Sequence, residues 1–311
     1  LRKMAYFISD QLNLKKEKVE IAASISKTDL VSGLVGEFPE LQGIMGKYFA
    51  SNQGFEEDVS LAVSEHYLPI SISSHVPKRP ISYGLSIIDK LDTLVGFFLI
   101  NEKPTSSKDP FALRRSSIGL LRTLIENNLR VSIRDLVDYL IRMYSEQGVK
   151  ELNQNTHSEL LKFFRDRMKN ILKEKKIRPD IIEASVSSHL NDDFLELYKK
   201  TIVMNKFISK DLGRNAVSTY KRASNILNSE IKNKNEELSN ATDPGIFKNE
   251  FEKALFKKIN ELKQYFSGMT NKQNFDETLV YLASAKNEVF DFFDNVKVND
   301  ESDLVKKNRL E

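Results

Sequence analysis

Two adjacent arginines, Arg114 and Arg115, stand where a helix is predicted to begin. Asp109 can cap that helix, and Pro110 suits its first position because the missing N–H would have no partner there. The apolar residues that follow recur on one helical face, namely Phe111, Ile118, Leu121 and Ile125. Cations near a helix start oppose the helix dipole. The pair is therefore predicted either to be compensated by nearby acids or to contact an anionic partner such as a phosphate.

A second candidate for phosphate binding is the segment 158–178, which has eight basic and three acidic residues and a net charge of +5. An apolar stripe at helical spacing runs between the charges. The candidate contacts in this segment are Lys162, Arg165, Lys169 and Lys173. Most charge runs are solvated faces, so a solvated surface and a phosphate-binding surface both stay open for this segment.

The carboxylates of Asp29 and Asp89 raise the question of a metal site. Helical HD-type phosphohydrolases hold a divalent metal with a His-Asp pair and a later Asp, and the segments 27–29 and 89–92 are similar to these two elements. Thr28 stands where the imidazole belongs, and a transition-metal site without imidazole lacks its usual ligand. The sequence therefore predicts a degenerate, non-catalytic HD-like fold that holds no metal. Its two carboxylates are predicted to accept hydrogen bonds between helices.

No other pattern of residues supports catalysis. His66 has no paired acid beyond its sequence neighbour Glu65, so a packed or capping histidine is predicted. The glycines between residues 33 and 46 do not form a phosphate-binding fingerprint, because no Gly-Lys-Ser/Thr follows them. The chain contains no Gly-x-Ser-x-Gly and no cysteine, so nucleophilic catalysis has no support.

The elements that must position these residues all read as helices, and no run alternates strictly between polar and apolar residues, so an all-α fold is predicted. The predicted helices are 1–13, 15–35, 58–67, 81–98, 111–128, 133–144, 156–176, 179–186, 193–204, 215–228, 249–266 and 274–293. Residues 229–246 are predicted to form a surface excursion. Changes of pattern predict three domains: an HD-like helical domain at 1–130, a helical middle or linker domain at 131–205, and a helical bundle at 206–311.

Composition limits the classes of function. The net charge of +3 gives no argument for a nucleic-acid partner, which must rest on local patches. The absence of cysteine excludes disulfides and thiolate metal sites and fits a reducing compartment. The richest apolar run, 94–100, is far shorter than the ~20 residues of a membrane span. Because the chain opens in helical sequence without methionine and stops without a helix-ending signal, we expect it to be part of a longer protein.

Several motifs together closely resemble the β subunit of the bacterial tetrameric glycyl-tRNA synthetase. They are Gly36-Glu-Phe-Pro-Glu-Leu-Gln-Gly-Ile-Met-Gly46, Glu65-His-Tyr-Leu-Pro69, Ile88-Asp-Lys-Leu-Asp-Thr-Leu-Val-Gly96 and Ser106-Ser-Lys-Asp-Pro-Phe-Ala-Leu-Arg-Arg115. A later segment, Ala216-Val-Ser-Thr-Tyr-Lys-Arg-Ala-Ser-Asn-Ile-Leu227, resembles the first helix of the helical anticodon-binding domain found in arginyl-tRNA synthetases and in this subunit. The resemblance spans nearly the whole chain and implies that an N-terminal half of the subunit precedes it and that the final bundle is truncated at its C-terminus.

The resemblance implies a non-catalytic, tRNA-binding part of a cytoplasmic glycine–tRNA ligase. The class II aminoacylation site, with its ATP and magnesium, is implied to lie on the α subunit within an α2β2 assembly. The implied partners are the α subunit and glycine-specific tRNA, with no membrane and no cofactor in this chain. The implied tRNA contacts of the bundle are Lys221, Arg222 and Asn225, beside the six cations named above.

Two alternatives stay open on the sequence. A metal-dependent HD phosphohydrolase acting on a nucleotide would bind a divalent metal, whereas a purely structural scaffold for the α subunit would bind neither metal nor tRNA.

Overall fold

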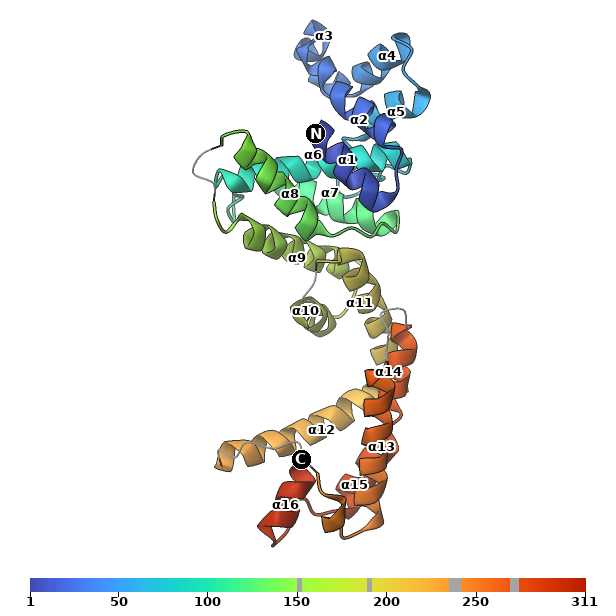
Figure 1. Cartoon of the computed structure of the whole chain (residues 1–311), viewed down its shortest axis with the longest axis vertical. Coiled ribbons are helices and arrows are strands. Elements are labelled where there is room, and N and C mark those ends of the chain that lie inside the picture. Colours follow the sequence, from blue (N-terminus) through green and yellow to red (C-terminus); the bar gives the residue numbers. More distant parts are fainter. Residues whose placement is uncertain (150–152, 189–191, 235–241, 269–273) are drawn as a thin grey trace. The chain divides into compact units, whose positions relative to one another are not determined.

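The computed structural model describes residues 1–149, 153–188, 192–234, 242–268 and 274–311, and every regular element in these ranges is a helix (Figure 1). The predicted all-α class is therefore confirmed. The chain forms two compact units, Leu1–Thr201 and Ile202–Glu311. The three predicted domains stay a prediction, and residues 235–241 of the predicted surface excursion lie outside the described ranges. No described helix combines the length and apolar character that crossing a bilayer requires.

The helices of the first unit begin with a group before the long central helix: α1 (Arg2–Leu12), α2 (Lys16–Ile25), α3 (Gly33–Glu37), α4 (Ile44–Asn52) and α5 (Glu57–Glu65). Two 3-10 turns, η1 (Thr28–Val31) and η2 (Pro39–Leu41), lie among them. The remaining helices are α6 (Pro80–Leu99), α7 (Leu113–Glu126), α8 (Ile133–Glu146), α9 (Thr156–Glu174), α10 (Pro179–Ser188) and α11 (Phe194–Ser209), which extends into the second unit.

The core of the first unit is built around α6. This helix starts with Pro80 in its first turn and is apolar on most of its surface, so it can be covered from several sides. It packs against α1, α2, α5, α7, α8 and α9. Its fully buried side chains include Leu85, Ile88 and Leu91. The polar residues that lie between these apolar positions are consequently carried into or beside the core.

The second unit consists of α12 (Asp211–Lys234), η3 (Pro244–Ile246), α13 (Glu250–Ser267), α14 (Phe275–Ala283), α15 (Lys286–Asn295) and α16 (Asp303–Leu310), with the end of α11. Helix α12 packs against α14 and α15, and α13 packs against α15. The buried cluster of the second unit contains Phe207, Leu279 and Ala283.

A buried ion pair joins α16 to the start of α13. Asn249 and Glu252 form a capping box at the start of α13. The Glu252 carboxylate also pairs with the Arg309 guanidinium, and both side chains are almost fully buried. Burial alone raises the pKa of Glu252, but the hydrogen bonds from Arg309 and from two backbone amides outweigh it, and the pKa is lowered. Arg309 therefore anchors α16.

Several helices differ from the prediction for identifiable reasons. The predicted helix 15–35 is divided into α2, η1 and α3, because the Ser32 side chain accepts the Val35 amide and caps α3. The predicted helix 274–293 is divided into α14 and α15 around Ser284. Helices α4 and α16 were not predicted, since each is short and shows little apolar periodicity.

Candidate functional site

The arginine pair lies at the start of α7, which begins later than predicted. Leu113 is the first helical residue, because Ala112 adopts the left-handed conformation with φ 53° and ψ 34°. The Asp109 carboxylate nevertheless accepts the amides of Leu113 at 2.9 Å and Arg114 at 3.0 Å. Pro110 therefore precedes α7 instead of occupying its first position, and Asp109 compensates the orphan donors of the helix start.

The structure separates the roles of the two arginines. Arg114 is half-buried, donates to the Thr105 carbonyl and lies 3.9 Å from the Asp109 carboxylate. Arg115 is exposed, and within the described residues its guanidinium has no hydrogen bond and no ion pair. Arg114 is thus the compensated cation of the pair, while Arg115 is available to an external anion.

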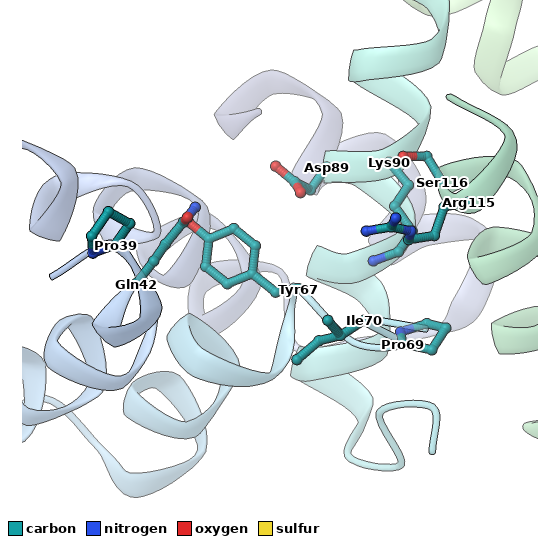
Figure 2. A pocket seen from close by; sticks show the side chains of 9 residues that line it. All are labelled: Pro39, Gln42, Tyr67, Pro69, Ile70, Asp89, Lys90, Arg115 and Ser116. Atoms are coloured by element: carbon teal, nitrogen blue, oxygen red, sulfur yellow. The ribbon is translucent and has the colours of Figure 1, made fainter. Parts of the chain in front are cut away.

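Arg115 lines a cavity of about 350 Å³ in the first unit (Figure 2). In Figure 2, Arg115, Ser116 and Lys90 extend from α6 and α7, and Pro39, Gln42 and Tyr67 lie across from them. The remaining lining residues are Pro69, Ile70 and Asp89. A guanidinium, a carboxylate, an amide and an aromatic ring around one cavity are the groups that bind the phosphate, base edge and base face of a splayed nucleotide.

The second cation at this cavity, Lys90, is not available to a ligand. Its Nζ donates to the carbonyls of His66 at 3.0 Å and Leu68 at 2.7 Å, and to Ser86 Oγ at 2.8 Å. Burial lowers its pKa to about 8. All three ammonium donors are engaged, so Lys90 holds the chain after α5 against α6 rather than binding an external anion.

The basic segment predicted at 158–178 forms α9, and its candidate cations differ in availability. Lys162 and Lys173 are exposed, Arg165 is half-buried, and none of the three forms an ion pair within the part of the chain that is described. Lys169 is bound to the Glu183 carboxylate at 2.6 Å. Of the four candidate cations, Lys162, Arg165 and Lys173 are therefore free of ion pairs within the described residues.

Arg167 brings the α9 charges next to the start of α7. Its guanidinium lies over the Phe163 ring at 4.7 Å. Burial, followed by the positive charge of Arg114, lowers the pKa of Arg167. Helices α7 and α9 pack together. The arginine pair of α7 and the basic segment of α9, which are separate in the sequence, are therefore neighbours in the structure. The sequence did not mark Arg167 apart from the other cations, because helical periodicity does not show which face meets another helix.

The two carboxylates assigned to degenerate metal positions lie in different surroundings. Asp29 is fully buried, and its Oδ2 accepts the amides of Gly43 at 2.6 Å and Gly46 at 3.1 Å. Asp89 Oδ1 lies 2.8 Å from Lys27 Nζ, which lies 2.9 Å from His66 Nε2. The structure therefore groups Asp89 with Lys27 and His66, whereas Asp29 binds two backbone amides. The ion pair of Lys27 with Asp89 nevertheless brings the segments 27–29 and 89–92 together.

Sequence reasoning missed this grouping because Lys27 and His66 are 39 positions apart. The prediction that His66 is packed agrees with its complete burial. Among the residues that the structure describes, no group of three or more His, Cys, Asp or Glu side chains is placed to hold a metal ion. The donor set at Asp89 does not fit a divalent metal, because an ammonium lies between the carboxylate and the imidazole.

The candidate contacts of the second unit lie on α12, where Lys221, Arg222 and Asn225 are exposed. Arg222 Nη1 lies 2.8 Å from Asp294 Oδ1, and Nη2 donates to the Phe293 carbonyl at 3.2 Å. Within the described ranges, Lys221 and Asn225 have no side-chain partner. Arg222 is therefore oriented by α15, while its two neighbours on α12 are free.

Comparison with known proteins assigns both halves of the chain. Residues 1–187 match a family model described as glycyl-tRNA synthetase beta subunit, and residues 216–311 match one described as DALR anticodon binding domain. The glycine–tRNA ligase beta subunit of Cereibacter sphaeroides is 37% identical over 289 residues, which are 93% of this chain and 42% of that protein.

Two further relatives with the same name give similar values. The protein from Rhodospirillum centenum is 37% identical over 298 residues, covering 94% of this chain and 41% of its own length. The protein from a Ruegeria species is 34% identical over 307 residues, which are 99% of this chain and 43% of that protein. The chain thus spans less than half the length of the curated relatives that it matches.

Proposed function

Because this chain belongs to the glycyl-tRNA synthetase β-subunit family, we propose that it is the tRNA-binding part of that subunit. In this proposal the α subunit attaches glycine to its tRNA with ATP and Mg²⁺, within an α2β2 assembly in the cytoplasm, and this chain supplies no catalytic residue. The observation that carries the proposal is the match of residues 216–311 to an anticodon-binding domain, whose helix α12 exposes Lys221, Arg222 and Asn225.

The residues of α12 have different proposed roles. Lys221 is a free cation and suits a phosphate of the anticodon arm. Arg222 is bound to Asp294 in an exposed ion pair, and such pairs contribute only ~0–1 kcal/mol, so a phosphate can compete for the guanidinium. Asn225 can hydrogen-bond the edge of an unstacked base, which is the usual way in which single-stranded RNA loops are read.

The first unit has a second proposed contact surface. It consists of Arg115 with its cavity and the three free candidate cations of α9, which are Lys162, Arg165 and Lys173. Arg115 suits a backbone phosphate, and the cavity suits a nucleotide that is turned out of its stack. The α9 cations would extend the electrostatic contact along a helical segment of the tRNA.

The experiment that tests the proposal measures tRNA affinity across salt concentrations, with glycine-specific tRNA, anticodon-altered tRNA and a non-cognate tRNA. The complete enzyme carries Lys221→Ala, Arg222→Ala or Asn225→Ala. Arg214→Ala is the matched control, because Arg214 is an exposed arginine of the same helix that pairs with Asp211 on that helix.

Loss of a phosphate contact weakens the binding of all tRNAs alike and reduces the salt dependence of tRNA affinity by about one counterion. We expect this result for Lys221→Ala and Arg222→Ala. Loss of a base contact reduces discrimination more than overall affinity, and we expect this for Asn225→Ala. If none of the three variants differs from Arg214→Ala while the fold is intact, α12 has a structural role and the proposal fails for this helix.

A scaffold for the α subunit is a second candidate function, and one surface favours it. Large apolar side chains are exposed on η1, α3 and α4 and just after α3: Leu30, Val31, Leu34, Phe38, Ile44 and Tyr48. Val31 is 90% exposed and Tyr48 62%. Clustered exposed apolar side chains often mark a protein-binding site in soluble proteins, and the α subunit is the protein partner that the family implies.

Co-purification of the α subunit with the β subunit tests this surface. Val31→Asp and Tyr48→Asp each place a charge in the patch, whereas Ile72→Asp places one at an exposed apolar residue outside it. We expect the first two variants to lose α subunit and the third to retain it. Equal retention by all three would eliminate the patch as the docking surface.

A further inference from the structure

An ammonium group occupies the centre of a small polar cluster inside the first unit. Lys27 Nζ lies 2.8 Å from Asp89 Oδ1, 2.9 Å from His66 Nε2, and 4.2 Å from the centre of the Tyr67 ring. The three partners come from two different segments, since His66 and Tyr67 follow α5 and Asp89 lies on α6. Lys27 itself precedes η1 and reaches the cluster from a third segment.

The hydrogen bonds fix the tautomer of His66. Its Nδ1 lies 2.7 Å from the Val63 carbonyl, which can only accept, so Nδ1 carries the proton. Nε2 therefore presents its lone pair to the Lys27 ammonium, which can only donate. A metal-bound histidine has the same arrangement, with one nitrogen facing the cation and the other donating to a backbone carbonyl.

The charges of the cluster require a cation at this position. The Asp89 side chain is 17% exposed, and a carboxylate at that depth needs an opposite charge or several donors. Lys90, the neighbouring cation, is already bound to three oxygens. The face of the Tyr67 ring adds further negative potential beside the ammonium. Lys27 is therefore the group that neutralises Asp89.

We propose that the Lys27 ammonium is an internal substitute for a divalent cation between His66 and Asp89. The side chain supplies from the polypeptide the positive charge that a bound metal would supply, so the cluster is complete without an ion. It follows that Lys27 keeps His66 and Asp89 from binding a metal ion.

The test uses the 311-residue chain and Co²⁺, whose visible absorption reports its coordination by protein ligands. Lys27→His removes the ammonium and adds an imidazole to His66 and Asp89, which completes a three-ligand set of the kind that binds transition metals. We expect this variant to bind one Co²⁺ at least tenfold more tightly than the unsubstituted chain. Adding His66→Gln to it should abolish the gain. Lys18→Ala, which removes an ion pair with Glu56 elsewhere in the unit, is the control and should leave Co²⁺ affinity unchanged.

Two results would overturn the proposal. One is a folded Lys27→His chain with no gain in Co²⁺ affinity, and the other is an unsubstituted chain that binds Co²⁺ through His66. The tautomer gives a test that does not depend on whether a variant folds. Nitrogen NMR of the unsubstituted chain at neutral pH should find His66 protonated at Nδ1 alone, and protonation at Nε2 would also refute the proposal.

Discussion

His66 is fully buried, and both of its ring nitrogens are engaged, one by the Val63 carbonyl and the other by the Lys27 ammonium. Burial first and the charge of Lys27 second lower the pKa of His66 to about 4, although Asp89 acts in the opposite direction. The charge of Lys90, whose ammonium donates to the His66 carbonyl, lowers the pKa further. The folded chain therefore keeps His66 neutral at pH values where the unfolded chain, with a histidine pKa of about 6.5, binds a proton.

The first prediction is that the first unit loses stability as the pH falls from about 6.5 towards 4. The unfolded state binds more protons in this window, so the free energy of unfolding decreases with falling pH, by about 3 kcal/mol at most. Urea unfolding at pH 7 and pH 4.5 measures the difference. His66→Gln should reduce it, whereas His75→Gln, at an exposed histidine, should not. An equal pH dependence in all three chains would contradict the prediction.

Asp29 has a structural role that follows from its two amide donors. Its carboxylate holds the turn at Gly43, where φ is +78° and an added Cβ would lie 2.8 Å from the Tyr67 ring. The turn places α4 against α5. The second prediction is that Asp29→Ala lowers the free energy of unfolding by about 2 kcal/mol, because two buried amides lose their acceptor. Asp10→Ala, which removes an exposed ion pair with Lys16, should change it by less than about 0.5 kcal/mol. Similar losses in both variants, measured in urea, would argue against this role.

At the scale of elements, the start of α7 separates a cation that supports the fold from one that faces outward. The difference was not predictable from two adjacent arginines. It depends on the left-handed Ala112, which shifts the helix start, and on where Asp109 and Thr105 lie around it. The same limit applies in part to the predicted helix 15–35. The Ser32 cap that begins α3 is a local contact, but the buried Asp29 accepts amides from residues 14 and 17 positions away.

The third prediction concerns this pair of arginines. Arg115→Gln should weaken tRNA binding about tenfold, the effect of losing one charge-assisted hydrogen bond of ~1.5 kcal/mol, and should leave the free energy of unfolding unchanged. Arg114→Gln should lower the free energy of unfolding, because Arg114 ties α7 to the loop before it. Parallel tRNA titrations and urea unfolding of both variants test whether the two arginines have these separate roles. Equal tRNA affinities, or a reversed order of stability, would contradict it.

At the scale of the whole molecule, helical periodicity was sufficient to predict the fold class and most helices. The sequence motifs were sufficient to identify the family. The clusters at Lys27 and at Arg167 were not predictable, because each joins helices through side chains far apart in the sequence. The compact units, Leu1–Thr201 and Ile202–Glu311, likewise follow from contacts that no local pattern contains.

The fourth prediction is that the two units unfold in separate transitions, because each has its own buried core. The chain has no cysteine, so a single cysteine can report each core. Ala5→Cys lies in the core of the first unit and Ala283→Cys in that of the second. Thiol labelling during urea titration should give two midpoints. Acidification to pH 4.5 should lower the urea midpoint of the first unit more than that of the second unit. One shared midpoint under all conditions would contradict the prediction.

The buried pair of Glu252 and Arg309 joins residues 57 positions apart, and this separation has a consequence during synthesis. A chain emerges from the ribosome from its N-terminus, and its domains generally fold in that order. Helix α13 emerges with the carboxylate that caps it, but without the guanidinium that neutralises this carboxylate on burial. The second unit can therefore close only once residue 309 has left the exit tunnel. The first unit has its own core within Leu1–Thr201, so it can fold while the second is still being made.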